Sequence, residues 1–202
     1  MKTATQILKN KRFILNKMKE MLPDKDCGAI WEDSERRLEK ILRSYKELPK
    51  GVRTHTDNYI FPSAAIYQAL SEKVGKEKAY QVVEEAAIEK TTAMGEKLGK
   101  MMRFPGMKDL FLKVWDPLTK KMFGANSGFQ NVFYPKKKGE YRMDVIACPY
   151  CCYFAELHCP ELTKIFCEND DRGYGNLPGL EFLRTGTLGK GADRCDFYMR
   201  KT

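Results

Sequence analysis

The chain has 202 residues, of which 43% are hydrophobic and 31% are charged, and its formal net charge at pH 7 is +9. This length and composition are typical of a folded domain with a substantial core and exclude a disordered chain. No apolar run approaches the roughly 20 residues of a membrane-spanning helix, and the N-terminus lacks the apolar stretch of a signal peptide. We therefore expect a cytoplasmic protein without a membrane partner.

The excess positive charge is spread along the chain. Lysines occur in separated pairs and in one run at residues 136–138, and they do not alternate with arginine and aromatic residues. This pattern indicates solvated faces and argues against a nucleic-acid partner, and it leaves the oligomeric state open. The seven cysteines are expected to be reduced thiols, because the chain shows no export signal.

Helical periodicity dominates the first two thirds of the chain. Apolar residues recur every three or four positions over residues 5–21, 31–48 and 62–70, and again in a long run from residue 76 to residue 98. Shorter helices are predicted over 97–103 and 107–122, with Pro117 perturbing the second of these.

The pattern changes after residue 125. Two β-rich runs, 128–134 and 141–147, are joined by a lysine-rich turn with a glycine and predict an antiparallel hairpin. A helical segment interrupted at Pro160 is predicted over 150–167, and strands are predicted over 180–187 and 195–200. Without a repeat or a linker, this order predicts a single α+β domain over 1–202. Its mostly helical part, 1–125, packs on an antiparallel sheet of about four strands within 126–202.

Reactive side chains gather in the last third of the chain. Cys148 and Cys151 have Cys-x-x-Cys spacing, which can bind a metal or form a redox pair; alternatively, the thiols pack as small core residues. His55 and His158 are the only histidines, and either can be a surface or capping residue. The candidates for proton transfer or nucleophilic attack are therefore a thiolate or one of the carboxylates Asp170, Asp171 and Asp196.

Arg184 lies within the predicted strand 180–187. A guanidinium between apolar residues either is solvated or pairs with a carboxylate, which could belong to a substrate or to Asp170 or Asp196. Strand alternation places Arg184 and Thr187 on opposite faces unless a bulge at Gly186 realigns them.

The last third also carries a resemblance to a known family. The pattern consists of Cys148-Pro149-Tyr150, Cys159-Pro160-Glu161-Leu162, Cys167 with Asp170, Arg184-Thr185-x-Thr187-Leu188 and Gly191-x-x-x-Cys195-Asp196-Phe197. It resembles the L-2-amino-thiazoline-4-carboxylic acid hydrolase family. More distantly, the end of the chain is similar to 4-vinyl reductase-type small-molecule-binding domains. Metal-binding members of that type have an acidic residue and a cysteine where this chain has Arg184 and Thr187.

The first resemblance implies a hydrolase that opens a small heterocycle at a non-peptide C–N or C–S bond. Residue types suited to that reaction give Cys167, Asp170, Cys195 and Asp196 as catalytic candidates, and Arg184, Thr185, Thr187 and Cys148 as substrate-binding candidates. A divalent metal, if the protein uses one, would be bound by Cys148, Cys167 and Cys195. The second resemblance implies instead a non-enzymatic ligand-binding or regulatory module.

Overall fold

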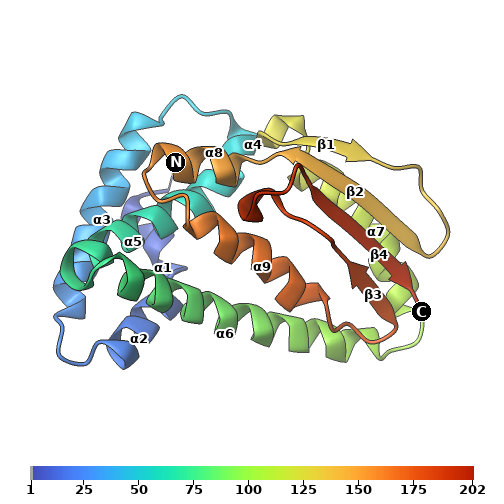
Figure 1. Cartoon of the computed structure of the whole chain (residues 1–202), viewed down its shortest axis with the longest axis horizontal. Coiled ribbons are helices and arrows are strands. Elements are labelled where there is room, and N and C mark those ends of the chain that lie inside the picture. Colours follow the sequence, from blue (N-terminus) through green and yellow to red (C-terminus); the bar gives the residue numbers. More distant parts are fainter. Residues whose placement is uncertain (1) are drawn as a thin grey trace.

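A computed structural model describes residues 2–202 and confirms the α+β class, with helices first and a four-stranded antiparallel sheet in the last third (Figure 1). The helices are α1 (Ala4–Lys9), α2 (Arg12–Met21), α3 (Cys27–Ser44), α4 (Lys50–His55), α5 (Phe61–Val74), α6 (Lys76–Met102), α7 (Met107–Met122), α8 (Pro149–Glu156) and α9 (Leu162–Tyr174). A π-helical turn, η1 (Thr56–Ile60), joins α4 to α5, and the 3-10 turns are η2 (Ala125–Ser127) and η3 (Leu188–Lys190). The strands are β1 (Gln130–Phe133), β2 (Glu140–Ala147), β3 (Leu180–Leu183) and β4 (Cys195–Lys201).

Local signals in the sequence set several helix ends. Thr3 and Gln6 form a capping box at the start of α1, and the Asp26 side chain accepts a hydrogen bond from the Ala29 N–H at the start of α3. Gly75, with φ of 81°, separates α5 from α6. The left-handed conformation of Gly106 likewise precedes α7. Both positions favour glycine because other residues are strained there.

The sheet has the strand order β1-β2-β4-β3, and Val145 on β2 pairs with Cys195 on β4. Because side chains alternate along a strand, Val145, Cys195 and Met199 share one face, and this face is buried against α7 and the ends of α6 and α9. Asp196 and Tyr198 lie on the opposite face of β4. In Figure 1, α7 runs behind the sheet, and α9 extends from the helical part toward it.

Two hydrophobic clusters hold the fold together. One joins α1, α2, α3, α5 and part of α6 to α8 and the start of α9, and the other lies between the sheet and α6, α7 and α9. Tyr150, near the start of α8, packs against both clusters. This ring therefore connects the helical part to the sheet part.

Several predicted boundaries are wrong. Residues 5–21 form two helices, because the chain turns at Lys11 and places that side chain over the rings of Phe13 and Tyr59. Residues 97–103 are not a separate helix, since α6 continues to Met102 without a break. Residues 150–167 form α8 and the start of α9, and α9 then continues to Tyr174. Asp170 and Asp171 are therefore helical residues and not part of an acidic turn.

The strand predicted over 180–187 is also shorter than expected. It ends at Leu183, so Arg184, Thr185 and Thr187 lie in a loop and strand alternation does not apply to them. The reason is visible in the hydrogen bonds: the N–H groups of Thr185 and Gly186 bind the carboxylate of Asp196 in place of a strand partner.

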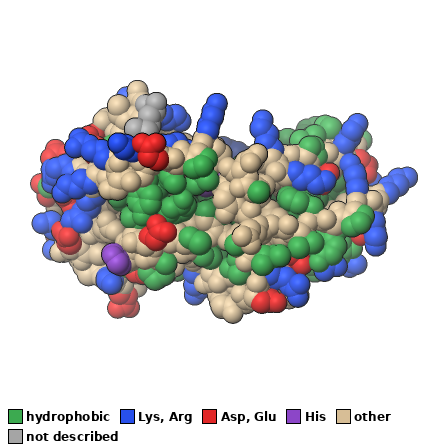
Figure 2. All heavy atoms as spheres, turned by 90° about the horizontal axis from the view of Figure 1, so that it is seen from above, with side chains coloured by type: hydrophobic (Ala, Val, Ile, Leu, Met, Phe, Trp, Pro, Cys, Tyr) green, Lys and Arg blue, Asp and Glu red, His purple; other side chains and the backbone are tan. Residues whose placement is uncertain are grey.

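Among residues 2–202, no helix has both the length and the apolar character needed to cross a bilayer. Figure 2 shows lysine and arginine side chains distributed around the edges of one face, with acidic side chains among them, instead of gathered in one basic patch.

Helices α6 and α9 cross with their backbones in close contact. A Cβ atom at Gly95 on α6 would lie 3.0 Å from the carbonyl oxygen of Arg172 and 3.2 Å from that of Gly173. On α9, a Cβ atom at Gly173 would lie 3.0 Å from Cε of Met94. These glycines fix the position of α9, which carries Cys167 and Asp170.

We predict that Gly95→Ala lowers the free energy of unfolding by about 1–3 kcal/mol, because the added methyl group overpacks a helix crossing made of backbone. Gly99→Ala is the matched control on the same helix: its Cβ would meet Cδ of Pro178 at an ordinary 3.5 Å. Helix propensity should then make it neutral or stabilising by up to about 1 kcal/mol. Urea unfolding measures both, and equal stability of the two variants would contradict the close crossing.

Candidate active site

Cys167 on α9 and Cys195 on β4 place their thiols side by side. Cys195 donates its thiol hydrogen to the sulfur of Cys167, and this bond is the largest cause that lowers the pKa of Cys167 to about 6. The same bond, together with burial, raises the pKa of Cys195. The interaction therefore favours negative charge on Cys167 and a neutral thiol on Cys195.

The turn η3 and the residue before it bind both sulfur atoms. The N–H of Leu188 donates to Sγ of Cys195 at 3.2 Å, and the N–H of Gly189 donates to Cys167. The hydroxyl of Thr187 is buried and has no hydrogen-bond partner among the described residues, and its proximity also lowers the pKa of Cys167. The thiolate is thus held by donors that are in place before any substrate binds.

Only glycine fits at position 189. A Cβ atom there would lie 2.7 Å from Sγ of Cys167 and 2.9 Å from Cγ2 of Thr163. Glycine lets the backbone approach the sulfur closely enough for its N–H to bind the thiolate.

Arg184 connects the loop after β3 to α9. Its guanidinium pairs with Asp170 at 3.1 Å and with Asp171, and it also donates to the carbonyl oxygen of Cys167. It lies against the rings of Phe182 and Phe197, and its side chain is only 3% exposed. The sequence offered Asp170 and Asp196 as ion-pair partners of Arg184. In the structure Arg184 pairs with Asp170 and also with Asp171, and it does not pair with Asp196. Binding of a substrate carboxylate by Arg184 stays a prediction, and it requires Asp171, which is 47% exposed, to be displaced.

Asp170 is a carboxyl group with an unusually high pKa. Burial is the main cause, the Cys167 thiolate adds to it, and the positive charge of Arg184 opposes it; the result is a pKa of about 7. The side chain is nevertheless 34% exposed. Asp170 thus has a pKa near neutral pH, as acid–base catalysis requires, and it lies close enough to Cys167 for their charges to interact.

The buried side chain of His55 links the end of α4 to Tyr150 on α8 and to the last residue of α7. Nε2 of His55 donates to the carbonyl oxygen of Met122 at 2.8 Å, so Nδ1 accepts from the Tyr150 hydroxyl at 3.1 Å. Burial lowers the pKa of His55 and raises that of Tyr150, which keeps both groups neutral. Of the two expected alternatives for His55, a surface or a capping residue, the first is wrong, since His55 is 1% exposed and lies at the N-cap position of η1.

Three predicted site residues lie apart from the thiolate. Asp196 projects from β4 on the opposite face to Cys195, and both its oxygens are occupied by the N–H and hydroxyl groups of Thr185 and the N–H of Gly186. Cys148, at the start of α8, pairs with Cys151. The predicted roles of Asp196 and Thr185 in catalysis and substrate binding therefore rest on sequence alone.

The expected metal ligands do not converge. Cys167 pairs with Cys195, whereas Cys148 pairs with Cys151. In the described part of the chain, no three side chains of histidine, cysteine, aspartate or glutamate come together in a way that could hold a metal ion. The donor set therefore does not fit the three-cysteine site that the sequence suggested.

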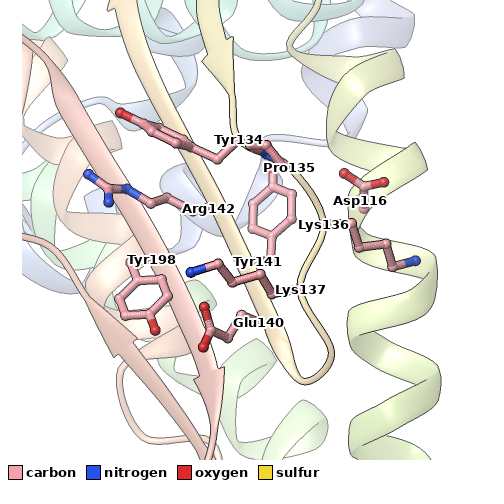
Figure 3. Close-up of a pocket in the computed structure, with 9 residues that line it drawn as sticks. All are labelled: Asp116, Tyr134, Pro135, Lys136, Lys137, Glu140, Tyr141, Arg142 and Tyr198. Carbon is pink, nitrogen blue, oxygen red and sulfur yellow. The ribbon is translucent and has the colours of Figure 1, made fainter.

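A surface pocket of about 300 Å³ lies elsewhere, beside the hairpin of β1 and β2 (Figure 3). Its walls come from α7, the hairpin and β4, and the guanidinium of Arg142 lies 4.2 Å from the ring centre of Tyr134. None of the predicted site residues lines it. We therefore place the candidate active site at Cys167, Asp170 and Arg184, and not at this pocket.

Comparison with known proteins gives one match. A sequence model of the L-2-amino-thiazoline-4-carboxylic acid hydrolase family matches residues 53–199, a segment that contains every residue of the thiolate cluster. No curated protein and no solved structure shows a significant match to the chain.

We predict that Thr187→Val raises the apparent pKa of Cys167 from about 6 by roughly one pH unit, because a buried hydroxyl next to the thiolate is replaced by a methyl group. The rate of alkylation by iodoacetamide as a function of pH, assigned to Cys167 by peptide mass spectrometry, measures this value. Thr185→Val is the matched control, since Thr185 binds Asp196 instead. Equal values in the two variants would contradict the role of Thr187.

Proposed function

The chain belongs to the L-2-amino-thiazoline-4-carboxylic acid hydrolase family, and from this premise we propose that it opens the ring of an aminothiazoline carboxylate by hydrolysis. Cys167 is the nucleophile, and Asp170 donates and accepts the proton. The observation that carries this proposal is the combination of a thiolate and a carboxyl group with a pKa near 7 at one place.

The substrate class suits a thiolate nucleophile. The ring of an aminothiazoline is a cyclic isothiourea, in which one carbon is bonded to the ring sulfur and to two nitrogens. That carbon is electrophilic, and its C–S bond breaks readily if the departing sulfur receives a proton. A thiolate is strongly nucleophilic, and Cys167 is ionised without a separate base at neutral pH.

In the first step, the Cys167 thiolate attacks this carbon and forms a new C–S bond. The ring C–S bond breaks, its electron pair goes to the ring sulfur, and that sulfur takes the proton of Asp170. The opened substrate is then attached to Cys167 as an isothiourea, and Asp170 is a carboxylate.

In the second step, one water molecule attacks the same carbon. Its oxygen becomes the carbonyl oxygen of a carbamoyl group, one of its hydrogens ends on the former ring nitrogen, and the other returns to Asp170. The bond to Cys167 breaks, and its electron pair restores the thiolate. The product therefore carries a free thiol and a carbamoyl nitrogen, and both side chains regain their starting states.

The other residues of the cluster hold these two groups in place. Cys195, Gly189 and Thr187 stabilise the thiolate each time it re-forms. Arg184 binds both Asp170 and the carbonyl of Cys167, so it fixes the carboxyl group relative to the nucleophile. This role makes Arg184 a positioning residue.

We predict a bell-shaped dependence of kcat/KM on pH when the purified protein is given L-2-aminothiazoline-4-carboxylate. Activity should rise as pH increases through about 6, where Cys167 ionises, and fall as pH increases through about 7, where Asp170 loses its proton. The two limbs belong to the interacting pair and not to either group alone. Asp170→Asn should lower kcat by on the order of 10²–10⁴ and remove the alkaline limb.

Asp171→Asn is the matched control, because Asp171 also pairs with Arg184 but is an exposed residue. It should keep the bell shape, and thermal unfolding of both variants separates loss of folding from loss of chemistry. An unchanged alkaline limb in Asp170→Asn would contradict the proposed proton transfer. Binding of the substrate without turnover by the wild type would instead favour a non-enzymatic ligand-binding module of the 4-vinyl reductase type.

A further inference from the structure

Cys148 and Cys151 lie where a strand passes directly into a helix. β2 ends at Ala147, Cys148 is the N-cap of α8, and Pro149 is the first helical residue. The N–H of Cys151 binds the carbonyl oxygen of Cys148 at 3.1 Å and closes the first turn. Residues three apart in a helical turn have Cβ atoms about 5–6 Å apart, so a backbone shift of about 1–2 Å at the N-terminus of α8 brings such a pair to disulfide geometry.

The two thiols already interact. Cys148 donates its thiol hydrogen to Cys151, which lowers the pKa of Cys151 and raises that of Cys148. Both residues are partly exposed, whereas Cys27, Cys159 and Cys195 are buried. The N–H groups of Tyr150 and Cys151, in the first turn of α8, stabilise negative charge on Cys148 as well. The thiolate is therefore shared by the pair. A nucleophilic thiol and a second thiol next to it are therefore present at one accessible place.

We propose that Cys148 and Cys151 form a redox-active dithiol that reduces low-molecular-weight disulfides and is itself converted to a Cys148–Cys151 disulfide. The site goes beyond the hydrolytic function, in which neither residue takes part. It has the local arrangement of dithiol oxidoreductases, namely a Cys-x-x-Cys pair at the start of a helix.

The reaction balances as two thiol–disulfide exchanges. The thiolate of the pair attacks one sulfur of the small disulfide, forms a mixed disulfide and releases one small thiolate, which takes up a proton. The second cysteine of the pair then loses its proton, attacks the protein sulfur of the mixed disulfide and releases the second small thiol. Two electrons pass from the protein dithiol to the small disulfide, which is reduced to two thiols.

Two other thiols lie near this pair. Cys152 is exposed and follows Cys151 directly, and its N–H also binds the carbonyl oxygen of Cys148, at 3.4 Å. The charge of Cys167 acts on Cys151. Cys152 is the competitor for a disulfide with Cys148 that the test must exclude. Cys195 is buried, and its sulfur accepts the N–H of Leu188, so oxidation of the pair that it forms with Cys167 would disturb η3.

The test is equilibration of the reduced full-length protein with glutathione disulfide, followed by alkylation and peptide mass spectrometry. The wild type should form an intramolecular Cys148–Cys151 disulfide that dithiothreitol reverses. Cys152→Ser should keep this disulfide, and Cys151→Ser should lose it completely. Cys148→Ser should stop at a mixed disulfide between glutathione and Cys151, because the second thiol is missing.

Three results would overturn the proposal. They are a wild type that keeps both thiols free in excess glutathione disulfide, a disulfide between Cys148 and Cys152, and a first disulfide between Cys167 and Cys195. Circular dichroism of each serine variant shows whether the fold is retained. The wild-type protein alone shows whether the Cys148–Cys151 disulfide forms.

Discussion

The buried guanidinium of Arg184 is the constraint on which the site depends. A charge that is 3% exposed is tolerated only if every part of it is paired, and here two carboxylates, one carbonyl oxygen and two aromatic rings surround it. To reach α9, the chain must leave β3 at Leu183. The loop that results carries Thr187 and turns through η3. This turn brings the N–H of Leu188 to the sulfur of Cys195 and the N–H of Gly189 to the sulfur of Cys167.

The same arrangement explains how a thiolate and a protonated carboxyl group coexist at neutral pH. Donors surround the sulfur of Cys167 and favour its negative charge, whereas burial disfavours a second negative charge on Asp170. These opposite shifts favour a nucleophile and an acid together, as a ring-opening hydrolysis needs.

The sequence predicted the composition of the site better than its geometry. Periodicity identified most helices, the hairpin and the α+β order, and the motif residues Cys167, Asp170, Arg184 and Cys195 do come together. The strand expected at Arg184 was wrong because the N–H groups of Thr185 and Gly186 bind Asp196 and the Arg184 side chain pairs with Asp170 on α9. Gly189 could not be identified as a contact to a sulfur atom, since its neighbour Cys167 is 22 residues away in the sequence and only tertiary structure joins them.

Covalent attachment of the substrate to Cys167 is the central claim, and acid-quenched single turnover followed by mass spectrometry tests it most directly. With protein in excess over L-2-aminothiazoline-4-carboxylate, the chain should transiently gain the mass of one intact substrate, located on Cys167, before the carbamoyl product appears. Full turnover by Cys167→Ala, or a transient adduct on Cys195 instead, would contradict the account.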